Sequence, residues 1–435
     1  MSEHITGTTA ADIAASVRGL RERGILTAGT LLPPVRELAA TLGVNRNTAV
    51  AAYRQLAQAG IVLSRGRAGT VIVGHDAVAQ EGYAADTVLR DVGTGNPDPA
   101  LIPDPSHALA TVTGRPVLYG EPVIDAALEE WARSWFAADV PGIDFRVTVT
   151  SGAVDAVERL LAQALMRDDA VALEDPCFLA SIHTVRLGGY RAVAVPVDAE
   201  GMTVEGLRSA LDAGVRAVIC TPRAQNPTGA SLSARRAADL RAVLADHPYV
   251  LVIEDDHFSM LSQRPYESLI GPAHRRFALV RSVSKFLGPD MCLALAATDP
   301  ETAARLAMRL SPGTTWVSHL LQRLTLAQLT DEAVVARIEA AAAHYAARNA
   351  AFAEQLSAHG IPASAGDGLN LWVDLPAPAH LVTDRLMRRG WLVRTGDDFA
   401  LDEHAAPSAH LRLTVHDLSD PDAAALVADL VSAST

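Results

Sequence analysis

Apolar residues along the first 74 positions recur with the spacing of three short helices and then of two short strands. Within residues 9–23, 34–42 and 49–60 they return every three or four positions, which is the period of an amphipathic helix. Gly43-Val44-Asn45 leaves only a short turn between the second helix and the third. Residues 61–63 and 70–73 have the pattern of strands. This order predicts a helix-turn-helix followed by a two-stranded wing.

The third predicted helix has a polar face near its beginning. Its apolar residues form one stripe, which leaves Arg46, Asn47 and Thr48 pointing outward. That part of a recognition helix reaches base edges in the major groove, and Arg36 on the preceding helix is placed to reach phosphates. The same arginines would also fit the solvated surface of a helical protein-interaction module. The ordered turn, helix and wing favour DNA.

Charge is unevenly distributed along the chain. Residues 1–74 hold eight arginines and four acidic residues, a formal charge of +4, whereas the whole chain carries −13. Such asymmetry is typical of a basic nucleic-acid-binding segment attached to an acidic body.

The cysteines and the apolar runs limit the classes of protein to which the chain can belong. The three cysteines are far apart and odd in number, so neither a disulfide framework nor a zinc site is indicated, and no metal site is expected. The N-terminus lacks the basic and apolar regions of a signal peptide, and no apolar run has membrane-spanning length. We therefore expect a soluble, cytoplasmic protein without a membrane partner.

Beyond residue 90 the chain alternates helical stretches with short apolar runs. Residues 75–90 show no clear period and are interpreted as a linker. Seven runs follow: residues 147–150, 170–173, 192–197, 217–221, 250–253, 278–281 and 293–297. This alternation predicts an α/β domain around a seven-stranded, mostly parallel sheet. Four runs end in polar clusters, and these clusters are expected to converge because ligands of open α/β sheets bind outside the carboxyl ends of the strands.

Lys285 is the only lysine among 37 basic residues. The composition favours arginine wherever any cation serves, so this lysine indicates chemistry that a guanidinium cannot perform. An amine that can lose its proton forms an imine with an aldehyde. An accidental surface lysine is the alternative, but the position directly after an apolar run, in Ser282-Val283-Ser284-Lys285, argues against it.

Candidate partners for a phosphorylated pyridine aldehyde, pyridoxal 5'-phosphate, stand at the other run ends. Such a cofactor needs a carboxylate at the ring nitrogen, a donor to the phenolic oxygen, a flat side chain on the ring and phosphate donors. Each candidate alone has an ordinary structural explanation, such as a turn, a helix cap or a core position. We assign the ring-nitrogen carboxylate to Asp255, the donor to the phenolic oxygen to Asn226, and the flat side chain to Phe178. The phosphate donors would be the residues at a helix start and two nearby serines, namely Ser151, Gly152, Ala153, Ser282 and Ser284.

These motifs carry two family resemblances. Residues 32–73 are similar to the GntR-type winged helix, with Arg36-Glu37-Leu38-Ala39 and Gly43-Val44-Asn45-Arg46 at the matching places. The order Ser-Gly-Ala, Asp-Pro-x-aromatic, Asn-Pro-Thr-Gly, Glu-Asp-Asp, Ser-x-Ser-Lys resembles that of fold type I pyridoxal-phosphate enzymes, whose domain is aminotransferase-like. The fusion of the two resembles the MocR family of transcriptional regulators over nearly the whole chain.

The resemblance implies the domain organisation and the DNA contacts. It places a winged helix-turn-helix in residues 1–74, the linker in 75–90 and the aminotransferase-like domain in 91–435. The large subdomain would span about 114–310, and the small one about 311–435 plus 91–113. A double-stranded operator would be contacted by a set of residues on the second and third helices and on the wing, namely Arg36, Arg46, Asn47, Thr48, Arg67 and Gly69.

The resemblance also implies a homodimer with composite cofactor sites. Tyr119 matches a tyrosine that reaches the phosphate in the partner subunit, and Arg412 matches the arginine that holds an amino acid carboxylate in the enzymes, a task that suits its bidentate fork. Two departures limit this comparison. Cys292 stands where the enzymes usually have a phosphate-binding arginine, and Phe258 stands where they usually have a tyrosine, a place that His257 could also serve.

Three functions stay open from the sequence. The preferred one is a regulator that senses pyridoxal phosphate and binds DNA. For its target, the resemblance implies vitamin B6 metabolism, for instance a pyridoxal kinase gene. A working aminotransferase is the second, supported by Lys285, Asp255 and Arg412. The third is a regulator whose degenerate site no longer binds cofactor, supported by Cys292. Because both departures count against efficient transamination, we expect at most weak enzyme activity.

Overall fold

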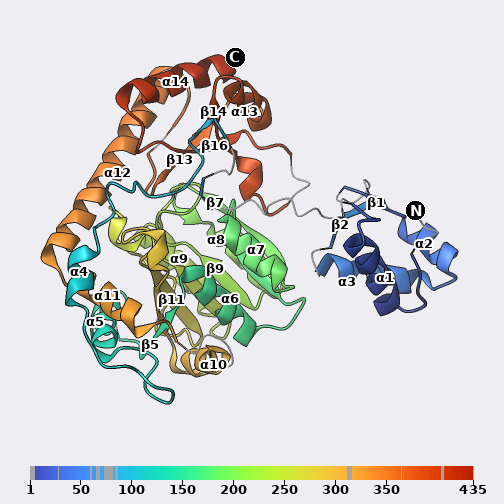
Figure 1. Cartoon of the computed structure of the whole chain (residues 1–435), viewed down its shortest axis with the longest axis horizontal. Helices are drawn as coiled ribbons and strands as arrows, with labels where there is room; N and C mark the ends of the chain where they lie inside the picture. The colour runs from blue at the N-terminus through green and yellow to red at the C-terminus, as the bar shows by residue number, and fades with distance from the viewer. Residues whose placement is uncertain are drawn as a thin grey trace. The chain divides into compact units, whose positions relative to one another are not determined.

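The computed structural model divides the chain into two compact units, Met1–Gln80 and Glu81–Thr435, which are described separately (Figure 1). The described residues are 5–27, 29–58, 61–64, 69–72, 82–83, 87–140, 142–310, 316–363, 365–402 and 406–434. Most of the predicted linker, residues 75–81 and 84–86, lies outside them. So do Val73 and the wing tip with Arg67.

The N-terminal unit contains three helices and a small sheet. The helices are α1 (Ala10–Glu22), α2 (Val35–Leu42) and α3 (Arg46–Gln58), and the strands are β1 (Leu31–Leu32), β2 (Val62–Ser64) and β3 (Thr70–Ile72) in the order β1-β3-β2. Thr9 and Asp12 form a capping box that starts α1, and Gly43, with a φ of 64°, ends α2. The sequence pattern predicts only the two strands of the wing, and the structure adds β1, which pairs with β3.

One apolar cluster holds this unit together. Ile13, Val17, Leu38 and Leu56 from the three helices are completely buried with side chains of the small sheet. Tyr53 adds a polar tie, since its hydroxyl donates to the backbone oxygen of Pro33 at 2.7 Å. The loop before α2 and the body of α3 are therefore fixed together, as a helix-turn-helix requires.

The second unit is built around an eight-stranded sheet. Its order is β5-β12-β11-β10-β9-β6-β7-β8, and the pairings make six strands run in one direction and β12 and β8 in the other. The prediction of a large, mostly parallel sheet is confirmed, and the short edge strand β8 was missed because two residues carry no periodic pattern. The strands are β5 (Arg146–Thr150), β6 (Ala170–Asp175), β7 (Arg191–Asp198), β8 (Gly201–Met202), β9 (Ala217–Cys220), β10 (Leu251–Asp255), β11 (Phe277–Ser282) and β12 (Ala294–Thr298).

Helices cover both faces of this sheet, as Figure 1 shows. Alternate strand residues face opposite sides. Val171 and Leu173 pack with α6, α7 and α10 in one cluster, whereas Ala170 and Ala172 belong to the cluster that includes α5, α8 and α9. The helices are α4 (Ser106–Thr111), α5 (Ala126–Ala137), α6 (Ala153–Ala164), α7 (Leu179–Leu187), α8 (Val204–Asp212), α9 (Ala234–Leu244), α10 (Pro300–Leu310) and α11 (His319–Leu329).

A second, smaller core follows at the C-terminal end of the chain. The helix α12 (Glu332–Ala358) links the two cores, because Ile338 packs in the large one and Phe352 in the small one. The small core also contains β13 (Asn370–Asp374), α13 (Ala379–Met387), β14 (Trp391–Leu392), β15 (Arg394–Thr395), β16 (His410–Thr414) and α14 (Asp420–Ser434), and it takes up β4 (Arg90–Asp91), which pairs with β14. None of the described helices combines the length and apolarity needed to span a membrane.

Candidate functional site

The carboxyl ends of β5, β6, β10 and β11 surround a cavity of about 240 Å³. These strands run in the same direction, so their ends meet at one edge of the sheet. Of the ten residues predicted to hold the cofactor, nine line this cavity, and Tyr119 does not. The lining residues are Ser151, Gly152, Ala153, Val154, Phe178, Asn226, Asp255, His257, Ser282, Ser284, Lys285 and Cys292.

Lys285 lies three residues beyond β11 and is half-buried. Its Nζ donates to the backbone oxygen of Gly95 at 2.8 Å. Ser282 and Ser284 shape the turn before it, since the Ser282 hydroxyl contacts both the hydroxyl and the amide of Ser284. The turn holds the amine at the cavity, where an aldehyde could meet it.

Asp255 ends β10 and is 6% exposed. Its Oδ1 atom is buried without a hydrogen-bond partner. Burial, and the neighbouring charge of Asp256, raise the pKa of Asp255 to about 7. An unpaired buried acceptor is costly in a folded protein, and a protonated ring nitrogen is the kind of donor that would pair it. The residues present therefore fit a pyridine cofactor.

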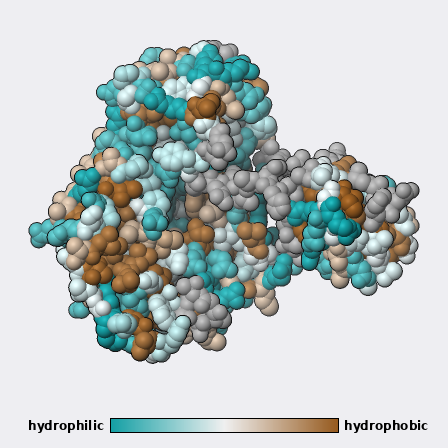
Figure 2. All heavy atoms as spheres, in the orientation of Figure 1, coloured by the Kyte–Doolittle hydropathy of each residue, from teal (hydrophilic) through white to brown (hydrophobic). Residues whose placement is uncertain are grey.

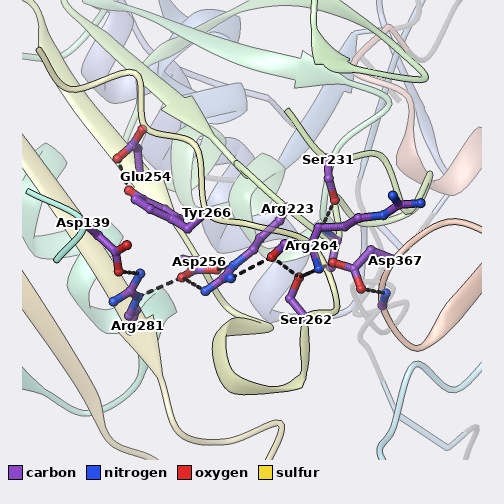
Figure 3. Close-up of polar contacts among 12 residues, drawn as sticks. Asp139, Arg223, Ser231, Glu254, Asp256, Ser262, Arg264, Tyr266, Arg281 and Asp367 are labelled. Carbon is purple, nitrogen blue, oxygen red and sulfur yellow. Dashed lines mark hydrogen bonds and ion pairs between the residues drawn. The ribbon is translucent and has the colours of Figure 1, made fainter. Parts of the chain in front are cut away.

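Asp256 faces a different environment, although it is the next residue. It is completely buried and forms ion pairs with Arg223 and Arg281, and Arg281 continues to Asp139 (Figure 3). Burial raises the pKa of Asp256, but the two arginines outweigh that effect and hold its pKa below the usual value. Sequence reasoning did not single out these residues. Their ion pairs tie the ends of β9, β10 and β11 together.

Asn226 connects the cavity to Arg412. The side-chain oxygen of Asn226 accepts from Nη1 of Arg412 at 3.1 Å. Arg412 is completely buried, its Nη2 donates to the backbone oxygen of Gly93 at 2.6 Å, and its guanidinium lies 4.8 Å from the centre of the Phe399 ring. Arg412 does not line the 240 Å³ cavity but contacts one of its walls, and its role as a carboxylate ligand stays a prediction.

The predicted phosphate end of the cavity is formed by neutral groups. Gly152, with a φ of 94°, precedes α6, whose first backbone N–H groups lack partners within the helix, as at any helix start. Cys292 lies against this loop, and its Sγ is 3.4 Å from the backbone oxygen of Ser151. Both Ser151 and Cys292 are exposed. Among the described residues that line the cavity, none is an arginine.

Two aromatic residues and one histidine complete the account of the predicted site. Phe178 lies at the start of α7 and lines the cavity, as does His257. Phe258 is 1% exposed and belongs to the large core. Tyr119 is 89% exposed, with its ring 5.4 Å from that of Trp316, so within its own chain it takes no part in the cavity.

The predicted DNA-reading residues lie on the outer side of the N-terminal unit. Arg46 and Asn47 at the start of α3 and Arg36 on α2 are exposed, and Thr48 is half-buried. The side chain of Asn45 caps α3 by accepting from the amide of Asn47 at 2.8 Å. Gly69, before β3, has a φ of 95° and lies close to the Leu31 side chain. The first turn of α3 thus presents polar side chains on a fixed helix.

Comparison with known proteins identifies the family. Residues 88–430 match the aminotransferase class I and II family, and residues 9–72 match bacterial regulatory proteins of the gntR family. The chain is 47% identical to the vitamin B6 salvage pathway transcriptional repressor PtsJ of Salmonella typhimurium over 98% of both chains. The chain belongs to the MocR family of transcriptional regulators. The expected family is confirmed, and its GntR domain implies that the chain binds DNA.

More distant relatives share one or both parts. The pyridoxine biosynthesis transcriptional regulator PdxR of Corynebacterium glutamicum is 26% identical over 71% of this chain and 70% of its own. The crystal structure of kynurenine aminotransferase from Pyrococcus horikoshii superimposes with a TM-score of 0.70 at 20% identity, covering 80% of this chain and 91% of the enzyme. The likeness to the enzyme shows the fold, which is that of class I and II aminotransferases.

Proposed function

We propose that this MocR-family chain is a transcriptional regulator that senses pyridoxal 5'-phosphate and controls vitamin B6 metabolism, with a pyridoxal kinase gene as its target. One observation carries the proposal. The only lysine of the chain shares a cavity with a buried carboxylate whose Oδ1 has no hydrogen-bond partner. The similarity to PtsJ, a repressor of the vitamin B6 salvage pathway, supports the biological setting.

Each cavity residue has a task toward the cofactor. Lys285 provides the amine that captures the aldehyde, Asp255 accepts a hydrogen bond from the protonated ring nitrogen, and Phe178 lies against the ring. Asn226 donates to the phenolic oxygen while keeping Arg412 in place for the carboxylate of an amine effector. The phosphate is held by neutral donors, namely Ser151, Gly152 and Ala153 at the α6 start with Ser282 and Ser284. Bound pyridoxal phosphate supplies a reactive aldehyde on an electron-withdrawing ring.

A homodimer would complete the site. Figure 2 shows a hydrophobic area at the lower left of the second unit, over the region of α4, α5 and α11. Exposed apolar side chains on α4, on α11 and in the loop between α4 and α5 include Leu109, Leu320, Leu118, Tyr119 and Val123. An apolar patch of this kind marks a protein interface. In the proposed dimer it is covered by a second copy, and Tyr119 reaches the phosphate in the partner, which accounts for its exposure in one chain.

Cofactor capture can be tested by the visible absorbance of the imine. Adding pyridoxal phosphate to the full chain should produce this absorbance, and Lys285→Ala should abolish it, because no other lysine exists. Arg305→Ala, which removes a cation from an exposed ion pair on α10, is the control and should retain it. A wild-type chain without absorbance, or an unchanged Lys285→Ala variant, would overturn the proposal and leave a regulator with a degenerate site.

DNA recognition can be tested with a duplex from the region upstream of the chain's own gene. Arg46→Ala should weaken binding by about tenfold, because one base-contacting arginine contributes about 1–3 kcal/mol. Arg18→Ala removes the same charge from the exposed side of α1 and should have a smaller effect. Equal affinities for wild type and Arg46→Ala would remove α3 as the recognition helix.

An aminotransferase is the second candidate, because Arg412 and Asn226 are hydrogen-bonded beside the lysine. The buried Phe258, which has no hydroxyl, counts against it. Steady-state transamination with a panel of amino acids distinguishes the two functions. Turnover at about 1 s⁻¹ or faster, which is usual for enzymes, would favour the enzyme, and turnover far below it favours the sensor.

A further inference from the structure

Three consecutive backbone oxygens, those of Gly93, Thr94 and Gly95, each accept a hydrogen bond from a different part of the molecule. Gly93 accepts from Nη2 of Arg412 at 2.6 Å, and Gly95 accepts from Nζ of Lys285 at 2.8 Å. Between them, Thr94 accepts from the amide of Gly82 at 2.7 Å. Gly82 lies two residues beyond Gln80, the last residue of the DNA-binding unit. The two cations of the candidate site and the start of the second unit thus meet on one tripeptide.

This tripeptide is also held by β16 of the small core. The amide of Gly95 donates to the Thr414 hydroxyl at 2.9 Å, and the amide of Thr414 donates to the oxygen of Val92 at 2.7 Å. Residues 92–95 are buried. The small subdomain therefore fixes one side of the tripeptide, and the contacts of its three oxygens set how its peptide planes are turned.

Both glycines are required by the local geometry. A side chain at Gly93 would come within 2.9 Å of the Arg394 side chain and 3.1 Å of its backbone nitrogen. Gly95 has a φ of 64°, a conformation that favours glycine. Gly95 therefore works as a pivot whose two peptide planes carry the contacts to Gly82 and Lys285. A change at the lysine is passed across a single flexible residue.

We propose that the tripeptide of residues 93–95 is a relay, in which capture of an aldehyde by Lys285 releases Gly95 and thereby loosens the attachment of Gly82 that follows the DNA-binding unit. This inference rests on the proposed function, because it describes how the ligand state of that site reaches the DNA-binding unit. A ligand can shift such an equilibrium only if it favours one arrangement over the other. The exchange of one hydrogen bond at Lys285 provides that difference.

The chemistry of capture removes the donor that Gly95 uses. The nitrogen of Lys285 forms a double bond to the aldehyde carbon, and the aldehyde oxygen leaves as water with two of the ammonium protons. No oxidant or reductant is needed. At most one N–H remains, and its direction is fixed by the plane of the imine, so the contact with the Gly95 oxygen is lost.

Two substitutions at Lys285 separate the hydrogen bond from the imine. Methionine has a similar length, cannot form an imine and has no donor, whereas arginine cannot form an imine but retains donors. Without any ligand, the DNA affinities of Lys285→Met and Lys285→Arg should differ by about fivefold or more. The direction from the Arg variant to the Met variant should be the direction in which pyridoxal phosphate changes the DNA affinity of the wild type. The probe is the duplex from the chain's own upstream region.

Hydrogen exchange on the full wild-type chain provides a second measurement that depends on no variant. Pyridoxal phosphate should speed the exchange of the Gly82 amide by about fivefold or more, since its bond to Thr94 opens more often. The Lys285→Met chain should show the same faster exchange without ligand, and its circular dichroism shows whether it is folded.

The outcomes distinguish the relay from the proposed function. If wild type forms the imine and its DNA affinity responds to pyridoxal phosphate, but Met and Arg at position 285 behave alike and Gly82 exchange stays constant, the relay is wrong and the sensor stands. If wild type forms no imine, the proposed function fails first. An imine with faster Gly82 exchange, together with a Met variant that behaves like the loaded wild type, supports the relay.

Discussion

The two ends of the cavity differ in how they are built. At the ring end, Asp255 and Asn226 are buried, and the turn with Lys285 follows a strand whose end is locked by the Arg281–Asp256 ion pair. At the phosphate end, Ser151 and Cys292 are exposed, and the donors are backbone amides and hydroxyls. The proposed ring end contains a buried carboxylate and the lysine, whereas the proposed phosphate end is lined by uncharged residues and includes the exposed Ser151 and Cys292.

This difference separates two properties that an enzyme needs together. In the proposed site, imine formation and ring binding depend on Lys285 and Asp255, which line the same cavity. Tight retention of the cofactor depends on charge-assisted phosphate contacts, which the described cavity residues do not provide. A sensor benefits from this combination, because a ligand that is never released cannot report its concentration. Substitutions at each end, and a change of pH, can test this contrast.

Asp255→Asn should weaken binding of pyridoxal phosphate by about 100-fold, because a hydrogen bond between charged groups contributes roughly 1.5–3 kcal/mol and the buried amide lacks the negative charge. The measurement is a titration followed by imine absorbance. Asp198→Asn, which removes a carboxylate from the half-exposed ion pair with Arg236, is the control. An Asp255→Asn chain with wild-type affinity would show that the ring end is not the firmly binding one.

Cys292→Arg should tighten binding by about tenfold, because a guanidinium at the α6 start adds a charge-assisted contact to the phosphate worth at least about 1.4 kcal/mol. Cys292 is exposed, so a longer side chain has room. Cys292→Ser, which stays neutral, should change the affinity little. If the arginine variant binds no tighter, another group already anchors the phosphate and the contrast between the two ends is weaker than proposed.

The smallest effect concerns pH. Burial and the charge of Asp256 raise the pKa of Asp255 to about 7. Without ligand, the Asp255 carboxyl is therefore mostly neutral below about pH 7. The folding stability that this neutral carboxyl confers is lost as the pH rises through about 7. A protonated ring nitrogen binds the ionised carboxylate. Affinity for pyridoxamine phosphate, which has no aldehyde, should therefore rise about threefold between about pH 6.5 and about pH 7.5.

The Asp255→Asn variant shows whether this pH dependence comes from Asp255. The pKa values of Glu174 and Glu254 are also raised to about 7, mainly by burial, so the slope alone does not identify the group. Asp255→Asn should give a flat profile. A slope that persists in this variant would move the titration to another residue and remove the pH argument for the ring end.

The sequence predicted seven of the eight strands of the large sheet because these strands are continuous apolar runs, four of which end in polar clusters. All seven runs became strands, with bounds that shifted by one or two residues. It missed β1 and β8, which have two residues each and pair with a longer neighbour rather than following a pattern of their own. It also missed the five strands of the small core, β4 and β13 to β16. Nine predicted cofactor residues share one cavity because parallel strands deliver their carboxyl ends to the same edge.

Other features left no trace in the sequence pattern. The ion pairs from Asp256 to Arg223 and Arg281 join residues at the ends of three strands, and nothing in the motif Glu254-Asp255-Asp256 indicates these two arginine partners. Gly93 and Gly95 lie in a stretch without periodic apolar residues, where two glycines indicate only a turn or a close approach of the backbone to its neighbours. Their oxygens carry no side-chain signal at all.

The sequence by itself determined the family, the order of the elements and the chemical importance of Lys285, because motifs, periodicity and the absence of other lysines are local or countable properties. The tertiary structure decided which buried carboxylate keeps an unpaired oxygen and which backbone oxygens hold Lys285 and Arg412. The reason is physical. Pairing and desolvation depend on groups about 190 to 320 residues apart in the chain, which only folding brings within hydrogen-bond distance.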